Sequence, residues 1–87
     1  MRFAICDDEP EHINILQDHF NKRPELAISY DAYTSGEALL AAYNNGARYD
    51  ALFIDMEMGV INGIDTANAV RTLDDKAIII YVTSHTR

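Results

Sequence analysis

The chain has 87 residues, so it forms at most one domain, and a domain of this size buries only roughly 60–65% of its unfolded surface. Its formal net charge of -7 and pI near 4.6 argue against binding of nucleic acid or of an anionic membrane surface. Its single cysteine, Cys6, allows no disulfide pair, and no apolar run approaches the roughly 20 residues of a membrane helix. We therefore expect a cytoplasmic protein without a signal peptide or membrane segment.

Short apolar segments alternate along the chain with longer segments of helical periodicity. The segments predicted as strands are 2–6, 26–33, 51–54 and 77–83. The segments predicted as helices are 10–22, 35–45 and 63–74. Pro10 suits the first turn of the first helix, and Thr34 with Glu37 fits a capping box before the second.

Each predicted helix has an apolar face. The residues expected on these faces are Ile13, Leu16 and Phe20, then Ala38, Leu39, Ala42 and Tyr43, then Ile64, Ala67, Val70 and Leu73. The first, third and fourth predicted strands are continuously apolar, which is typical of strands covered on both faces of a parallel sheet. Strict alternation of strand and helix requires right-handed crossovers, so the predicted fold class is α/β, an open doubly wound parallel sheet of order β-α-β-α-β-α-β.

Polar residues follow three of the predicted strands. Asp7 and Asp8 come after the first, Asp55 ends the third, and Thr83 and Ser84 end the fourth. Ligands of such sheets bind beyond the carboxyl ends of the strands, where the strand order reverses. An ionised aspartate at the end of a buried strand is costly to desolvate, so we expect these side chains to form a functional site.

Three carboxylates in one pocket would repel one another unless a cation lay among them. A few oxygen ligands completed by water suit Mg²⁺ better than zinc, and the chain has neither a thiolate set nor an HExxH motif. With Mg²⁺ beside it, Asp55 would attack a phosphoryl group in line while Thr83 hydrogen-bonds one of its oxygens. The pattern therefore predicts an acyl phosphate on Asp55.

Three motifs in order resemble the receiver domain of bacterial two-component response regulators. The segment ICDDEP resembles the acidic pair after the first strand, FIDMEM with NGID the phosphoacceptor strand and its loop, and YVTSH the hydroxyl after the fourth strand. Each motif alone is of moderate specificity, but their order and spacing together are specific, and they span the whole chain. The resemblance implies a flavodoxin-like (CheY-like) sheet of strand order 2-1-3-4-5.

The resemblance also implies roles for individual residues. Asp55 would be the phosphoacceptor for a partner sensor histidine kinase, and Thr83 the switch hydroxyl that follows the phosphoryl group. Asp8 would bind Mg²⁺ directly, Asp7 through water, and Glu57 through its backbone carbonyl. The function implied is switching and not enzymatic turnover. YVTSH and INGI are most similar to receivers linked to LytTR-type DNA-binding domains, which implies an output in transcription control.

The sequence departs from the family pattern at several positions. Gly59 stands where the family commonly has proline, and Glu57 adds an acid beside the site. Residues 1–87 would be the N-terminal portion of a receiver, without the last helix-strand-helix, its phosphoryl-pairing lysine or an effector domain. Lys76 precedes the fourth strand, so it should lie at the opposite edge of the sheet. An incomplete fold would leave 77–83 as an apolar edge strand, for which we expect homodimerisation or strand exchange.

The remaining candidate residues have plainer interpretations. His12, His19 and His85 are predicted to be surface or core histidines, because His12 and His19 are seven residues apart and no cysteine or acid completes a zinc set. Cys6 is expected to be buried and inert. The tyrosines are expected to pack in the core and at its rim. They are Tyr30, Tyr33, Tyr43, Tyr49 and Tyr81.

The sequence also allows alternative functions. Asp7 and Asp8 would serve only as helix caps if no site exists. A haloacid-dehalogenase-like phosphatase also uses an aspartyl nucleophile with Mg²⁺, but it needs DxD after the first strand, whereas here Asp55 and Glu57 follow the third. A flavodoxin-like cofactor binder would need a phosphate-cradling loop in place of CDDEPE. A pseudo-receiver used only for assembly is the last alternative.

Overall fold

The computed structural model describes residues 1–82 and contains four strands, three α-helices and a short 3-10 segment, η1. In chain order these are β1 (Arg2–Cys6), α1 (Pro10–Asn21), η1 (Pro24–Leu26), β2 (Ser29–Tyr33), α2 (Gly36–Asn44), β3 (Ala51–Asp55), α3 (Gly63–Arg71) and β4 (Ile78–Val82). Thr83, the predicted switch residue, and the rest of segment 83–87 lie outside the described residues.

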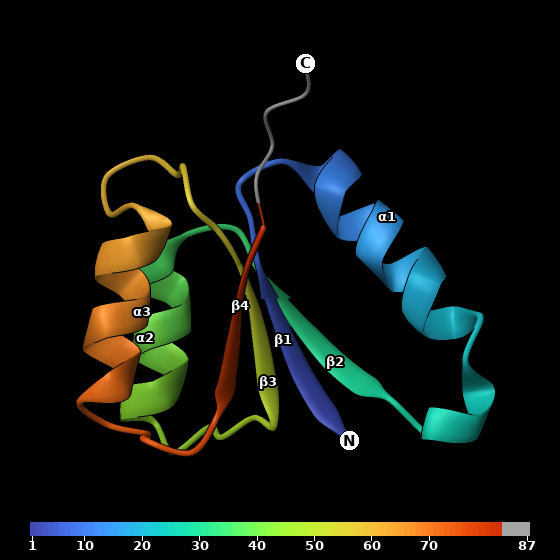
Figure 1. The fold of residues 1–87 in the computed structure, drawn as a ribbon. Coiled ribbons are helices and arrows are strands. Elements are labelled where there is room, and N and C mark those ends of the chain that lie inside the picture. The colour runs from blue at the N-terminus through green and yellow to red at the C-terminus, as the bar shows by residue number, and fades with distance from the viewer. Residues whose placement is uncertain (83–87) are drawn as a thin grey trace.

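The four strands form one parallel sheet in the order β2-β1-β3-β4. The chain moves outward from β1 to β2 and then returns to the other side of β1 to form β3. The strand order therefore reverses between β1 and β3, which is where a doubly wound sheet binds its ligands. Helix α1 covers one face of the sheet, and α2 and α3 cover the other (Figure 1). The predicted α/β architecture is confirmed.

A separate hydrophobic core lies on each face. The larger one joins the sheet to α2 and α3 and includes Leu39, Tyr43, Leu52, Ile54, Ala67 and Val70. The smaller one joins the sheet to α1 and is largely aromatic. There Phe20 lies 5.2 Å from Phe3 and 5.3 Å from Phe53, measured between ring centroids. Edge-on and tilted ring pairs of this kind contribute about 0.5–1.5 kcal/mol each beyond their buried area, and they fix α1 against the sheet.

Two predicted boundaries were wrong for local reasons. The second strand begins at Ser29 and not at residue 26, because Pro24–Leu26 form the 3-10 segment η1 and Ala27 has a left-handed φ of 49°. The capping box of Thr34 and Glu37 does not form. Ser35 is the N-cap of α2 instead, and its hydroxyl accepts a hydrogen bond of 3.1 Å from the Ala38 amide.

The apolar face predicted for α3 is rotated from the one observed. Ile64 and Leu73 are exposed, while Ala67 and Val70 are buried as expected. Gly63 and Thr66 complete the buried stripe, which keeps the three-to-four-residue spacing of a helix face. Small residues allow α3 to approach the sheet closely, and hydrophobicity alone does not reveal them.

Strand β4 is not covered on both faces, contrary to prediction. The exposed fractions of Ile78 and Ile80 are 63% and 40%. Phe53 on β3 belongs to the core beneath α1. Ile80 pairs with Phe53 from the outer side, and so Ile80 lies beyond the area that α1 covers. Ile79 points to the other face and packs on the core beneath α2 and α3.

Asp74 links α2 to the turn before β4 and gives a first testable prediction. It accepts hydrogen bonds from the Tyr43 hydroxyl at 2.8 Å and from the Lys76 and Ala77 amides at 3.0 and 3.2 Å. Because Tyr43 is buried, truncation of its partner leaves a buried hydroxyl unpaired. We expect Asp74→Ala to lower the free energy of unfolding by about 1–3 kcal/mol in urea titrations.

The effect should depend on pH with a definite sign. Desolvation raises the pKa of Asp74, but the Lys76 amide and the Tyr43 hydroxyl outweigh it, so the net pKa is lowered. The stabilisation is therefore present above the unfolded pKa of about 3.9 and is lost as the pH falls through the folded value. The neighbouring, exposed Asp75→Ala is the control. Equal losses in both variants at neutral pH would contradict the prediction.

Candidate functional site

The candidate site lies at the carboxyl ends of β1 and β3. Cys6 pairs with Ile54 in the sheet, so Asp7, the next residue after β1, lies beside Asp55, the last residue of β3. Both aspartates are almost fully buried, with exposed fractions of 2% and 1%. The structure thus brings together two predicted site residues that are 48 positions apart in the chain, at the point where the strand order reverses.

Only one of the two oxygens of the Asp55 carboxylate has a hydrogen-bond partner among residues 1–82. Its Oδ1 accepts a hydrogen bond of 3.1 Å from the Glu57 amide, whereas its buried Oδ2 has no hydrogen-bond partner among residues 1–82. A buried oxygen without a partner costs about 1–3 kcal/mol, and more when it carries charge. Together with the second buried carboxylate of Asp7, this oxygen forms a donor set that fits a hard divalent cation.

The electrostatic surroundings of Asp55 support the same assignment. Burial raises the pKa of Asp55, the Glu57 amide lowers it, and the charges of Asp7 and Asp8 raise it, with a raised net value. A positive charge at this position would favour the ionised carboxylate, because it would offset both desolvation and repulsion.

Asp7 is held by contacts from the start of α1. Its Oδ1 accepts a hydrogen bond of 2.9 Å from the Glu9 amide, and the two carboxylate oxygens lie 3.2 and 3.1 Å from Nδ1 of His12. One ligand atom each from Asp7, His12 and Asp55 lie within 4.8 Å of one another. These three residues form the Asp-His-Asp cluster.

The other predicted site residues occupy different positions. Asp8 is exposed and lines a neighbouring cleft of about 440 Å³, walled by Thr34–Glu37 and by Met58–Ile61. Glu57 is exposed, and its amide bonds to Asp55. The predicted direct ligand Asp8 is therefore next to the Asp-His-Asp cluster but not part of it, although its charge reaches Asp55.

The loop after β3 is fixed at both ends. Met58 is buried with its sulfur 3.7 Å from the Cys6 sulfur, while Val60 at the loop tip is 92% exposed. At the far end, the Gly63 amide donates to the Met56 carbonyl at 3.0 Å. A Cβ on Gly63 would lie 1.9 Å from the carbonyl oxygen of Asp55, so only glycine allows this approach.

The capping alternative for the acidic pair is not supported. The N-cap of α1 is Glu9, which makes no side-chain capping bond, and Asp7 bonds to the Glu9 amide, outside the helix.

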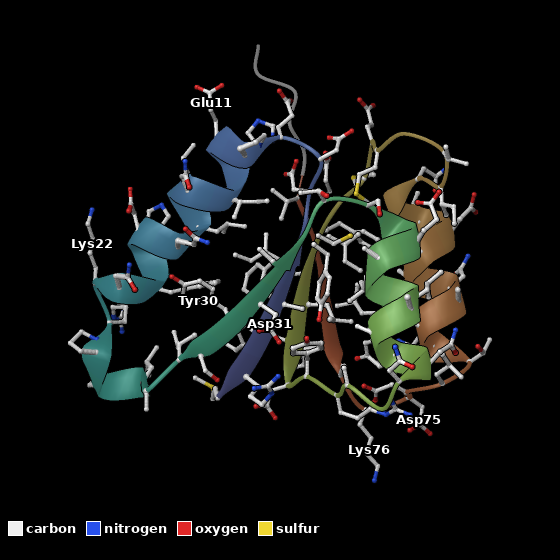
Figure 2. All side chains as sticks on the ribbon, turned by 180° about the vertical axis from the view of Figure 1, so that it is seen from behind. Glu11, Lys22, Tyr30, Asp31, Asp75 and Lys76 are labelled. Atoms are coloured by element: carbon white, nitrogen blue, oxygen red, sulfur yellow. The ribbon has the colours of Figure 1, made fainter. Side chains whose placement is uncertain are left out.

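Lys76 lies at the opposite end of the sheet from Glu11 at the start of α1, as Figure 2 shows. The prediction that Lys76 cannot reach Asp55 is confirmed.

His12 is the site residue that sequence reasoning missed. It was expected to be an ordinary surface or core histidine, yet its ring contacts Asp7 and its side chain is 25% exposed. The two acids beside it, Asp7 and Asp55, stand at the ends of two different strands, β1 and β3. Only the fold brings them beside the first turns of α1, so a search for short zinc-type spacings could not find them.

The expected packing residues behave as predicted except Tyr81, which is 45% exposed. Tyr43 and Tyr49 are buried, and the Tyr49 hydroxyl contacts that of Tyr33. Cys6 is fully buried, and burial, followed by the charges of Asp7 and Asp55, raises its pKa to about 12. Its thiol is therefore protonated and unreactive at neutral pH.

No helix within residues 1–82 has both the length and the apolar character needed to cross a bilayer.

Similarity to known proteins agrees with this geometry. The chain is 30% identical over 80 residues to the two-component response regulator 24 of Arabidopsis thaliana, a match that covers 92% of the chain and 55% of that relative. It is 31% identical over 86 residues to the sensory transduction protein LytR of Staphylococcus saprophyticus, covering 98% of the chain and 33% of LytR. The chain thus spans between a third and about half of these relatives.

Solved structures show the same fold. Response regulator protein TrrA from Thermotoga maritima, in complex with Mg²⁺-BeF, superimposes with a TM-score of 0.82 at 29% identity, over 98% of this chain and 70% of TrrA. The N-terminal domain of a response regulator/sensory box/GGDEF protein from Carboxydothermus hydrogenoformans gives 0.88 at 22% identity, over 100% and 67%. The family model of the response regulator receiver domain matches residues 3–87. The chain therefore belongs to the response regulator receiver domain family.

Proposed function

We propose that this chain accepts a phosphoryl group on Asp55 from a sensor histidine kinase and passes the signal to an output domain elsewhere in a longer protein. The observation that carries the proposal is the buried Asp55 carboxylate at the end of β3, with one unpartnered oxygen beside Asp7. The similarity to TrrA supports the choice of partner, because TrrA has also been solved in complex with histidine kinase ThkA.

In the proposed step, a carboxylate oxygen of Asp55 attacks phosphorus, and the bond from phosphorus to the kinase histidine nitrogen breaks. The product is an acyl phosphate, and the electron pair leaves with the imidazole. The Glu57 amide bonds to Oδ1 of Asp55 and so fixes the orientation of the carboxylate. Thr83 is proposed as the hydroxyl that later bonds to the phosphoryl oxygens.

Mg²⁺ is proposed as the cofactor. Asp7, Asp8, Asp55 and the backbone carbonyl of Glu57 would hold it, and it would supply positive charge to the phosphoryl oxygens during transfer. TrrA, a relative, has been solved in complex with Mg²⁺-BeF, which supports this assignment by similarity. The unpartnered Asp55 oxygen supports it from this chain.

The deciding experiment is incubation of the protein with acetyl phosphate, with and without Mg²⁺, followed by intact mass measurement. We expect one phosphoryl adduct that requires Mg²⁺ and is absent in Asp55→Asn. The exposed Asp75→Asn, at the opposite end of the sheet, is the control and should gain the adduct normally. A folded wild-type protein without adduct would overturn the proposal. Continuous release of phosphate from a phosphomonoester would favour the phosphatase instead.

The output is proposed to be DNA binding of the LytTR type and hence control of transcription. The support is the similarity to the sensory transduction protein LytR together with the INGI and YVTSH segments. The net charge of -7 argues against nucleic-acid contact by this segment.

Association through β4 is a further part of the proposal. Strand β4 is the outer strand of the described sheet, and its exposed Ile80 offers an apolar contact. We expect a homodimer in light scattering at high micromolar concentration, which Ile80→Lys converts to monomer. Val60→Lys, a change at a large hydrophobic residue that is 92% exposed, should leave the dimer intact. A monomeric wild-type protein would contradict the proposal.

A further inference from the structure

The Asp-His-Asp cluster contains a nitrogen donor that an all-oxygen magnesium site does not need. We propose that His12 is a direct metal ligand in this chain, and that it makes the site prefer borderline divalent cations such as Co²⁺, Ni²⁺ or Zn²⁺ over Mg²⁺. The inference rests on the proposed function only in that it uses the same carboxylates.

The spacing of the three groups suits a shared cation. At a metal-to-ligand distance of about 2.1 Å, ligands at right angles lie about 3.0 Å apart and opposite ligands about 4.2 Å apart. Nδ1 of His12 is 3.1 Å from Oδ2 of Asp7, which matches ligands at right angles. All three ligand atoms lie within 4.8 Å, so a contraction of less than about 1 Å would bring the widest pair into range.

The unpartnered oxygen of Asp55 is a second, independent observation in favour of a bound cation. A side chain that is 1% exposed holds Oδ2 without a hydrogen-bond partner among residues 1–82. The Asp55 carboxylate therefore has free coordinating capacity toward the cluster, and a cation would satisfy it.

Nδ1 of His12 lies within hydrogen-bond distance of both Asp7 oxygens, so a metal bound there would take the place of the proton on Nδ1. When Nδ1 faces a metal, the proton lies on Nε2, and ligating histidines usually direct that N–H toward a carboxylate or carbonyl. Here Nε2 lies 3.7 Å from Oε2 of Glu9, within ion-pair range. Glu9 would thus orient the ring from outside, while Asp7 and Asp55 face it from inside.

The donor types determine which cations benefit. Imidazole nitrogen suits zinc, cobalt and nickel, whereas Mg²⁺ prefers oxygen, so one imidazole added to two carboxylates should shift the preference toward transition metals. Loss of an outer-shell partner typically costs about 10- to 100-fold in metal affinity, and loss of a ligand should cost at least as much.

The test measures Co²⁺ and Mg²⁺ affinities by calorimetry at about pH 8, above the ordinary imidazole pKa of about 6.5. The readout is the ratio of the two affinities, together with the visible spectrum of bound Co²⁺, which changes when nitrogen is replaced by oxygen. We expect His12→Ala and His12→Gln each to lower the Co²⁺ to Mg²⁺ ratio at least about tenfold. His19→Gln, on an exposed turn of the same helix, should leave the ratio unchanged.

Two outcomes would overturn the inference. An unchanged ratio in both His12 variants would show that the ring does not bind the cation. A ratio lost in His12→Ala but kept in His12→Gln would make His12 a positioning residue that only donates a hydrogen bond to Asp7. Phosphorylation of the wild-type protein in Mg²⁺ is scored separately, so failure of the proposed function and failure of this inference give different results.

Discussion

Gly63→Ala is expected to lower the free energy of unfolding by about 3 kcal/mol or more, a loss unusual for a single added methyl group. Its Cβ would lie 1.9 Å from the carbonyl oxygen of Asp55 and 2.8 Å from Cα of Met56. Both atoms belong to the backbone, so no side chain can turn away to make room. Either α3 must move off the sheet or the end of β3 must shift.

The matched control is Gly59→Ala in the loop between these elements. A Cβ at Gly59 meets nothing within 4 Å, so its unfolding free energy should stay within about 0.5 kcal/mol of wild type. Urea unfolding monitored by circular dichroism measures both variants. Similar stabilities for the two would show that the backbone at Asp55 yields easily. In that case the close approach of α3 does not determine how the carboxylate is placed.

A divalent cation is expected to stabilise the wild-type protein strongly. At a concentration 100 times its Kd, a ligand that binds only the folded state adds about 2.7 kcal/mol. For a domain of this size each kcal/mol shifts Tm by about 4–8 °C, so we expect a rise of roughly 10–20 °C with Mg²⁺. Asp55→Asn should show little of this rise, because the oxygen that lacks a partner has been replaced by an amide nitrogen.

Without a cation, the wild-type protein should be less stable than Asp55→Asn. Burial, followed by the charges of Asp7 and Asp8, raises the pKa of Asp55, so its ionised form weakens the folded state. Asp55→Asn should therefore be more stable than wild type at neutral pH. The advantage should appear as the pH rises from the unfolded pKa of about 3.9 through the raised folded value. Differential scanning calorimetry at matched ionic strength, with Asp75→Asn as control, measures both effects. A Tm rise of equal size in wild type and Asp55→Asn would contradict this account.

Much of the fold could be predicted because it depends on patterns within single segments. The apolar runs before Asp7 and Asp55 identified β1 and β3, and the alternation of strand and helix required a parallel sheet. The same reasoning placed both carboxylates at one edge of the sheet, which the structure confirms.

The errors arose where contacts between distant segments decide the outcome. Composition made β4 look fully buried, although burial depends on which helix lies over it. Residues 26–28 are apolar and β-prone on average, but the left-handed backbone of Ala27 follows a 3-10 turn and delays the strand. His12 met its carboxylate partners only because α1 starts directly above two neighbouring strand ends.

The burial of Cys6 has a practical consequence for following the molecule in solution. Its thiol is fully buried, and its pKa is raised to about 12. Alkylating dyes should therefore not react with it at neutral pH. A cysteine introduced on the surface would then be the single labelled position among residues 1–82. Fluorescence from that one dye could report structural change on phosphorylation or metal loading without prior removal of the native sulfur.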